Sequence, residues 1–220
     1  MLRCRAILFD LDGVLVDSAE RVEKTWRDWA ARHQLDADLV IAAAHGRRTV
    51  ETVALVAPEL NVDAELRALE ISEATNSDGI YEIPGARDLL RRLAPKRWAI
   101  VTSGIRAVAE FRIQHTALPS PAVMICAEDI SRGKPDPEGY LAAAKGLGFS
   151  PADCVVIEDA PPGIDAAKAA GMRAVAVATT YPAERLMGAD LVVARLADLS
   201  VESIGDDIQI TRAKNTSKSR

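Results

Sequence analysis

Two carboxylates stand one residue apart directly after the first apolar run of the chain. The run AILF, residues 6–9, is followed by Asp10, Leu11, Asp12 and Gly13. Side chains alternate along an extended strand, so Asp10 and Asp12 are expected on the same side of its carboxyl end. Two carboxylates held there repel one another and lose solvation unless a cation or a shared proton lies between them. The pair therefore indicates a charged site, although Asp-x-Asp-Gly is also a common turn.

A second polar group follows the apolar run WAIV of residues 98–101. There Thr102 and Ser103 carry hydroxyls and backbone amides that can donate to a phosphate oxygen, and Gly104 lets the backbone approach a ligand closely. Taken alone, this segment is the ordinary cap between a strand and a helix. Its meaning depends on what the ends of the other strands carry.

A single lysine stands in the segment SRGKPDPEG. Lys134 lies between Gly133 and Pro135, in a loop that is expected to open a helix. The segment is not a P-loop, because the upstream glycine is missing and no Ser or Thr follows the lysine. A loop lysine is usually a solvated charge, but a lysine fixed beside a phosphate site neutralises the transferred oxygens.

Another apolar strand, VVI, ends in the adjacent acids Glu158 and Asp159. Hard oxygen ligands of this kind suit Mg²⁺. Together with Asp10 and Asp12 they would carry four negative charges, of which Lys134 cancels one. A phosphate dianion would be repelled from such a site unless a divalent cation were present. The three strand ends and the lysine loop together therefore predict a Mg²⁺-dependent site for phosphoryl transfer.

The elements that must position these groups are short apolar strands separated by helices. The strands are apolar on both faces, which is typical of a parallel sheet covered on both sides. The predicted architecture is a doubly wound, Rossmann-like α/β sheet, which binds ligands at the carboxyl ends of its strands. We expect strands at residues 6–9, 98–101, 123–126, 155–157, 174–177 and 191–193.

The connection after the first strand is far longer than an ordinary crossover. It shows helical periodicity without a convincing strand, which predicts an inserted α-helical cap domain over residues 17–83. The core domain is then expected at residues 1–16 and 84–203. Beyond it the chain becomes polar and basic, which predicts a disordered tail over residues 204–220. Helices are expected at residues 19–33, 35–44, 49–57 and 63–78 in the cap, and at 85–93, 105–114, 137–146 and 162–170 in the core.

Composition argues against several classes of function. The net charge of -5 and the pI near 5.3 provide no general attraction to nucleic acid or to an anionic membrane. No apolar stretch is long enough for a membrane span or a signal-peptide core. Cys4, Cys126 and Cys154 lack metal-ligand spacing and are typical of buried free thiols. We predict a cytoplasmic protein, monomeric or at most weakly dimeric, whose partner is a small phosphorylated metabolite.

The motifs D-L-D-G-V, T-S-G, G-K-P-D-P and E-D, in this order, resemble the haloacid dehalogenase (HAD) superfamily of phosphatases. The resemblance covers roughly residues 5–195, and the insertion after the first motif is similar to the helical cap of that superfamily's first cap class. It implies that Asp10 attacks phosphorus to form an aspartyl phosphate. It implies that Asp12 protonates the leaving alcohol and then activates the hydrolytic water. The resemblance further implies a phosphate-binding set of Leu11, Thr102, Ser103, Gly104 and Lys134, of which Thr102 and Lys134 hold the transferring group.

The same resemblance implies a Mg²⁺ cofactor. Its ligands would be Asp10, the main-chain carbonyl of Asp12, and Asp159. Glu158 would stand just outside the direct ligands. This set agrees with what cleavage of a phosphate ester lacks in water, namely a nucleophile, an acid and base, and neutralising charge.

The cap stretch HGRRTVETVALVAPEL and the later EDAPPGIDAAKAAGM are similar to the branch that contains glycerol-3-phosphate and 2-deoxyglucose-6-phosphate phosphatases. The resemblance implies that His45, Arg47 and Arg48 lie on a cap loop facing the site, with Arg48 the better candidate for a substrate contact. The alternative is a solvated arginine pair at a helix start. That branch more often carries an aspartate where Glu51 stands, which leaves the exact sugar or polyol open.

The predicted function is Mg²⁺-dependent hydrolysis of small phosphorylated sugars or polyols through an aspartyl-phosphate intermediate. One alternative is a phosphomutase of the β-phosphoglucomutase kind, which shares these motifs and the cap class. Another alternative is a non-catalytic protein that binds a phosphorylated metabolite, since a fold does not fix a function.

Overall fold

The core of the molecule is a six-stranded parallel sheet with the strand order β6-β5-β2-β7-β8-β9. The computed structural model describes residues 1–44 and 46–213. The order reverses on either side of β2, so β2 lies between β5 and β7, as expected for a doubly wound sheet. The strands of this sheet are β2 (Ala6–Phe9), β5 (Trp98–Val101), β6 (Met124–Ile125), β7 (Cys154–Glu158), β8 (Arg173–Val177) and β9 (Leu191–Val193).

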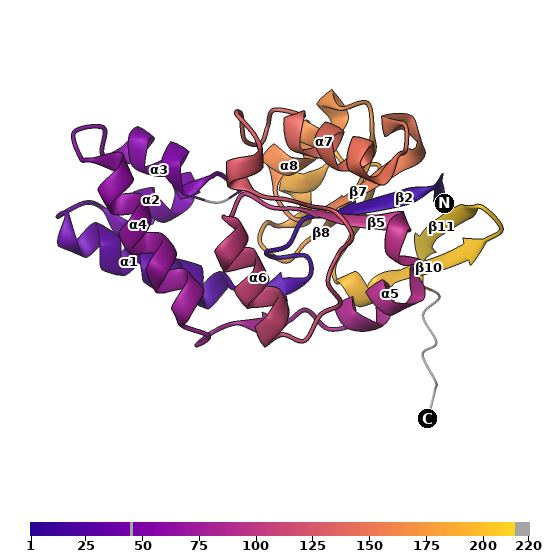
Figure 1. The fold of residues 1–220 in the computed structure, drawn as a ribbon, viewed down its shortest axis with the longest axis horizontal. Coiled ribbons are helices and arrows are strands. Elements are labelled where there is room, and N and C mark those ends of the chain that lie inside the picture. The colour runs from indigo at the N-terminus through magenta and orange to yellow at the C-terminus, as the bar shows by residue number, and fades with distance from the viewer. Residues whose placement is uncertain (45, 214–220) are drawn as a thin grey trace.

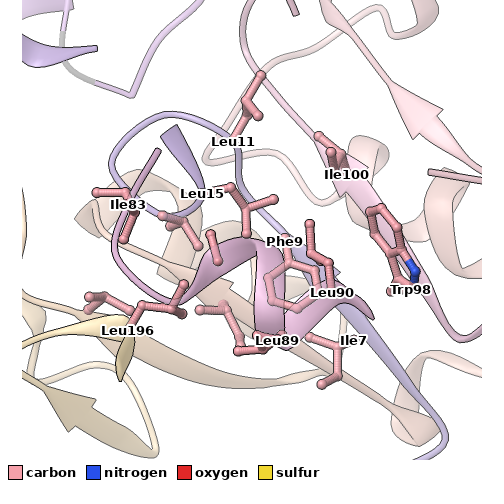
Figure 2. Packing of buried hydrophobic residues seen from close by; sticks show 14 of the residues in the cluster. Ile7, Phe9, Leu11, Leu15, Ile83, Leu89, Leu90, Trp98, Ile100 and Leu196 are labelled. Atoms are coloured by element: carbon pink, nitrogen blue, oxygen red, sulfur yellow. The ribbon is translucent and has the colours of Figure 1, made fainter. Parts of the chain in front are cut away.

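The side chains of β2 alternate between two hydrophobic clusters, one on each face of the sheet. Ile7 and Phe9 pack against the face covered by α5 (Ala86–Arg92) and α6 (Arg106–His115). Figure 2 shows Phe9 among Leu15, Leu89, Leu90 and Ile100. Ala6 and Leu8 pack on the opposite face, beneath α7 (Glu138–Leu147) and α8 (Pro161–Ala169). Burial on both faces explains the continuous apolar run, and it fixes the direction in which β2 delivers the next residue, Asp10.

The segment that follows β2 leaves the core through a short two-stranded ribbon and forms a helical cap. In the ribbon, β3 (Val16–Asp17) pairs antiparallel with β4 (Tyr81–Glu82). The cap has its own hydrophobic cluster, centred on Trp26 and Trp29, whose rings meet edge to face at 5.5 Å between centroids. Figure 1 shows these helices to one side of the sheet. They are α1 (Ala19–Arg32), α2 (Ala37–Ala44), α3 (Thr49–Val56) and α4 (Val62–Thr75).

The disordered tail predicted from residue 204 is wrong for the part of it that the structure describes. β10 (Leu199–Ile204) and β11 (Asp207–Arg212) form a hairpin, and β11 also pairs with β1 (Leu2–Cys4). Ile208 and Ile210 are buried, while Gln209 between them and the flanking Asp207 and Thr211 are polar, so this is a half-buried strand rather than a frayed end. Gly205, at a φ of 59°, makes the turn. Residues 214–220 lie outside the described residues.

The expected strands and helices of the sheet region agree with the structure within a few residues at each end. The short strands β1, β3 and β4 were not expected. In the described residues, no helix has the length and apolar character that a membrane crossing needs. Single 3₁₀ turns cover residues 95–97, 127–129, 151–153, 183–186 and 196–198.

Candidate active site

A cavity of about 380 Å³ lies between the carboxyl ends of the core strands and the cap. This is the edge at which open α/β sheets bind ligands. Polar and charged core residues form one wall: Asp10, Asp12, Thr102, Ser103, Arg112, Lys134, Asp159 and Thr180 line it. Cap residues form the other, including Val22, Trp26, Ala44, Gly46, Arg47, Thr49 and Glu73.

A chain of buried polar contacts runs from Asp10 into the core. The Lys134 ammonium bonds Asp10 Oδ1 and Glu158 Oε1, each at 2.6 Å, and the Tyr140 hydroxyl donates to the same Glu158 oxygen at 2.8 Å. We call these four residues the core cluster. Each of them is less than 9% exposed. A buried ion pair with its remaining positions hydrogen-bonded is held rigidly, so the Asp10 carboxylate is fixed in orientation.

Burial and mutual repulsion set the pKa values of these acids. Burial raises the pKa of Asp10 to about 7 even though Lys134 opposes the shift. Burial and the Glu158 charge raise the pKa of Asp159 well above its usual range. For Glu158, burial acts in the same direction, but Lys134 and the hydrogen bond from Tyr140 outweigh it and hold its pKa below the usual value. The protein therefore supplies too little positive charge for all three carboxylates to ionise.

Asp10, Glu158 and Asp159 are close enough to share one metal ion, because each offers an oxygen within 4.8 Å of the others. Gly13 keeps the space beside them open. It has a φ of 78°, and a Cβ there would lie 2.0 Å from Asp159 Oδ2. Three hard oxygen donors, a charge deficit and a glycine that leaves room fit a divalent cation of the Mg²⁺ type.

Asp12 is held by one oxygen and offers the other to the cavity. Its Oδ1 accepts hydrogen bonds from the Ser18 hydroxyl at 2.6 Å and from the Arg112 guanidinium at 2.7 Å. No donor among the described residues bonds Oδ2. The Asp12 side chain is 30% exposed, whereas that of Arg112 is 3% exposed. A carboxylate fixed in this way can exchange a proton with a bound ligand.

Arg112 joins the core to the cap, and it was not expected from the sequence. Its Nη2 also donates to Glu73 on α4 of the cap at 2.9 Å. A signal for it was present: Arg112 lies on the stripe of α6 that contains Val108, Ala109 and Ile113, all buried. A buried charged residue on an apolar stripe needs a partner of opposite charge, and Arg112 has two. Arg112 with its two carboxylate partners, Asp12 and Glu73, is called the bridging cluster below.

The expected phosphate-binding residues come together beside Asp10. Thr102 and Ser103 follow β5 directly, and the Thr102 hydroxyl oxygen accepts from the Gly104 amide at 3.0 Å, which leaves its hydrogen available to donate. The Ser103 hydroxyl instead donates to the Gly46 carbonyl of the cap at 3.2 Å. The backbone N–H groups of Leu11 and Ser103 bond no acceptor within the described part of the chain. These donors form a set that suits an anion.

The three cap residues expected at the site have different positions. Arg47 lines the cavity, and its guanidinium has no ion pair or hydrogen bond to any described residue. Arg48 does not line it: its guanidinium bonds Glu51 and the carbonyls of Ile130 and Ser131. Of the two arginines, the cavity wall therefore includes Arg47 and not Arg48. His45 lies outside the described residues.

Fold and site together define an α/β enzyme that acts on an anionic group at the carboxyl edge of its sheet. The chain belongs to the haloacid dehalogenase-like hydrolase family, whose family model matches residues 4–171.

Its similar proteins include several phosphatases. Hexitol phosphatase A of Escherichia coli is 43% identical over 205 residues, which cover 91% of this chain and 95% of that protein. Glycerol-1-phosphate phosphohydrolase 2 of Saccharomyces cerevisiae is 36% identical, covering 87% of this chain and 82% of that protein. Among solved structures, a hydrolase from Pseudomonas syringae superposes with a TM-score of 0.79 at 26% identity, covering 88% of this chain and 94% of that one.

Proposed function

We propose that this protein is a Mg²⁺-dependent phosphomonoesterase for small phosphorylated sugars or polyols. The observation that carries the proposal is the core cluster at the floor of the cavity: one oxygen of Asp10 is bound by Lys134 and the other bonds no donor among the described residues. Two of the proteins named above, hexitol phosphatase A and glycerol-1-phosphate phosphohydrolase 2, are by name phosphatases of a polyol phosphate, which supports the same substrate class.

The first half of the reaction transfers the phosphoryl group to the protein. Asp10 Oδ2 attacks phosphorus, the bond between phosphorus and the leaving oxygen breaks, and Asp12 gives its proton to that oxygen. Thr102 and the free amides of Leu11 and Ser103 donate to the phosphoryl oxygens. Lys134 holds the attacking carboxylate in place and lowers the negative charge around it.

The second half returns the protein to its starting state. Asp12, now ionised, takes a proton from water as that water attacks phosphorus, and the bond from phosphorus to Asp10 breaks to release inorganic phosphate. When bound, a Mg²⁺ ion held by Asp10, Asp159 and the Asp12 carbonyl, with Glu158 beside it, supplies the positive charge that brings a phosphate dianion next to a carboxylate. Asp12 is suited to both proton transfers, because Ser18 and Arg112 hold it without blocking Oδ2.

Replacing the nucleophile tests the proposal. Asp10→Asn removes the attacking oxygen's charge and should lower kcat/KM for phosphate release by at least about 1,000-fold, with the fold intact by circular dichroism. Asp17→Asn removes a carboxylate from the same cavity without touching the core cluster, and should change kcat/KM by less than about fivefold.

The assay is release of inorganic phosphate from glycerol 3-phosphate and glucose 6-phosphate in Mg²⁺, and again in excess EDTA. Full activity in Asp10→Asn would disprove the role of Asp10, and full activity in EDTA would disprove the role of the metal. An isomerised sugar phosphate formed without phosphate release would identify a mutase instead.

A further inference from the structure

Glu73 is the carboxylate that the cap contributes to the cavity wall close to Asp12. It stands near the end of α4, and its side chain is 18% exposed. Its Oε2 accepts the hydrogen bond from Arg112, whereas no donor in the described residues bonds Oε1. Glu73 therefore has one oxygen bound to Arg112 and one oxygen, Oε1, that can accept a hydrogen bond from a ligand in the cavity.

Arg112 fixes the position of Glu73 relative to Asp12, the proposed acid and base. Its Nη1 bonds Asp12 and its Nη2 bonds Glu73, so the two carboxylates stand on the same guanidinium group. In the proposed reaction, Asp12 protonates the leaving oxygen. Glu73 shares the Arg112 guanidinium with Asp12. It therefore lies beside the alcohol part of the substrate, next to the carbon atoms bonded to the leaving oxygen.

The charge around Glu73 determines which groups the alcohol part of the substrate can carry. Counted over the described residues, the cavity wall carries five carboxylates, Asp10, Asp12, Asp17, Glu73 and Asp159, against three cations, Arg47, Arg112 and Lys134. The charge of the Mg²⁺ proposed above is matched by the phosphate dianion of the substrate, so the wall keeps its excess of negative charge. Of its three cations, Arg112 and Lys134 are paired with carboxylates, and Arg47 has no carboxylate partner among the described residues. A hydroxyl group can donate to Glu73 Oε1, whereas a carboxylate or a second phosphate can only repel it.

We propose that Glu73, held by Arg112, recognises hydroxyl groups of the leaving alcohol near the scissile bond. The site then takes monophosphates of uncharged polyhydroxy alcohols and rejects alcohols that carry a second anionic group. This inference rests on the proposed function and adds to it a residue for selectivity. It assigns the Glu73–Arg112 pair of the bridging cluster to the choice of alcohol, while Asp10 of the core cluster and Asp12 carry the transfer.

Three substrates of equal carbon number test the inference. Glycerol 3-phosphate offers two hydroxyls, n-propyl phosphate offers none, and 3-phosphoglycerate replaces the terminal hydroxymethyl group by a carboxylate. The wild-type protein should prefer glycerol 3-phosphate to each of the other two by about tenfold or more in kcat/KM, because a buried acceptor left without its donor is costly.

Two variants separate hydrogen bonding from charge. Glu73→Gln keeps an acceptor oxygen but removes the charge, so it should improve turnover of 3-phosphoglycerate relative to glycerol 3-phosphate by about tenfold, as a ratio of specificity constants, while retaining the preference over n-propyl phosphate. Glu73→Met removes both properties and should also abolish the preference over n-propyl phosphate. Glu70→Gln is the matched control, because Glu70 lies one turn earlier on α4 outside this cavity wall and should leave all three ratios unchanged.

The outcomes distinguish this inference from the proposed function. Equal loss for all three substrates in both Glu73 variants would make Glu73 merely a structural partner of Arg112 and would overturn the inference, while phosphate release by the wild-type protein would still support the proposed function. Absence of phosphate release from any substrate by the wild-type protein would overturn both. Ratios that move as described, with Glu70→Gln unchanged, would support the inference.

Discussion

The core cluster and the bridging cluster share one cavity but are built in different ways. Asp10, Lys134, Glu158 and Tyr140 all belong to one domain, and three of them lie at or just beyond the ends of strands or at the start of a helix. The bridging cluster joins helix α6 of the core to helix α4 of the cap through Arg112. The comparison teaches that groups needing fixed geometry come from a rigid sheet edge. The groups that we propose to select the alcohol, Glu73 and Arg112, instead come from two domains.

Among the following tests, we expect the largest loss of activity from a substitution at Gly13, which lies beside the acids at the sheet edge. A Cβ there would lie 2.0 Å from Asp159 Oδ2 and 2.8 Å from Thr180 Oγ1, so Gly13→Ala must displace an acid of the metal-compatible cluster. We expect kcat/KM at saturating Mg²⁺ to fall by about 100-fold or more, since a displacement of about 1 Å can cost that much.

Gly148→Ala is the control for Gly13→Ala. Gly148 has the same φ of 78°, but a Cβ there would meet nothing within 4 Å. Both substitutions add backbone strain of about 1 kcal/mol, whereas Gly13→Ala alone disturbs the acids. Equal activity in the two variants would show that the space beside Asp159 is not needed.

The next largest effect concerns stability and pH in the absence of metal. The folded pKa of Asp10, raised by burial to about 7, exceeds its unfolded value of 3.8, so the folded protein binds the proton more tightly. Ionisation of Asp10 therefore lowers the free energy of unfolding. This loss is absent below about pH 4 and grows as the pH rises to about 7. In EDTA, Asp10→Asn should be more stable than the wild-type protein at pH 8, by a difference on the order of a few kcal/mol that vanishes near pH 4.

Denaturant unfolding at pH 4, 6 and 8 measures this difference. Asp190→Asn provides a control of opposite sign, because hydrogen bonds from Lys168 and the Ala174 amide overcome the opposing effect of burial and lower the pKa of Asp190. That variant should be less stable than the wild-type protein by a nearly constant amount from pH 4 to pH 8, because a lowered pKa adds its stability below the unfolded value of 3.8. A stability difference for Asp10→Asn that does not depend on pH would contradict the raised pKa of Asp10.

The smallest effect is expected for the two neighbouring arginines of the cap. Arg47→Met should raise KM by about three- to tenfold, because Arg47 lines the cavity. Arg48→Met should instead loosen the loop at Ile130 and Ser131, whose carbonyls it bonds, with a smaller change in KM. Hydrogen exchange of residues 130–133 measures that loosening, and Arg132→Met, on the same loop but 74% exposed, is its control. A larger KM change for Arg48→Met than for Arg47→Met would restore Arg48 as the substrate contact.

The parts of the molecule that the sequence could predict are those with a local signal. Asp10, Thr102 and Glu158 each end or follow a continuously apolar strand, and parallel strands bring their carboxyl ends to one edge whatever their distance in sequence. The insertion was equally visible, because its length exceeds any ordinary crossover. These features follow from periodicity and topology alone.

The remaining parts depend on how separate elements meet. Nothing near Glu73 in the sequence indicates that Arg112 would be its partner, since their pairing requires the cap to face α6. The positions of Arg47 and Arg48 likewise depend on the direction of one backbone turn, which decides which side chain enters the cavity. The β10–β11 hairpin is a different case. The segment VESIGDDIQI does alternate apolar and polar residues, but the polar residues of its outer face and the basic residues after it are also typical of a disordered tail.

The pairing of β1 with β11 also bears on how the protein assembles during synthesis. Strands β1 and β2 and the adjoining Asp10 leave the ribosome early, but Lys134, the ion-pair partner of Asp10, follows 124 residues later, and β11, the partner strand of β1, begins only at Asp207. Contacts of such long sequence separation form slowly and late in folding. On the ribosome, Asp10 therefore waits for Lys134 and Glu158 to be made, and β1 has no partner strand until nearly the whole polypeptide has been synthesised.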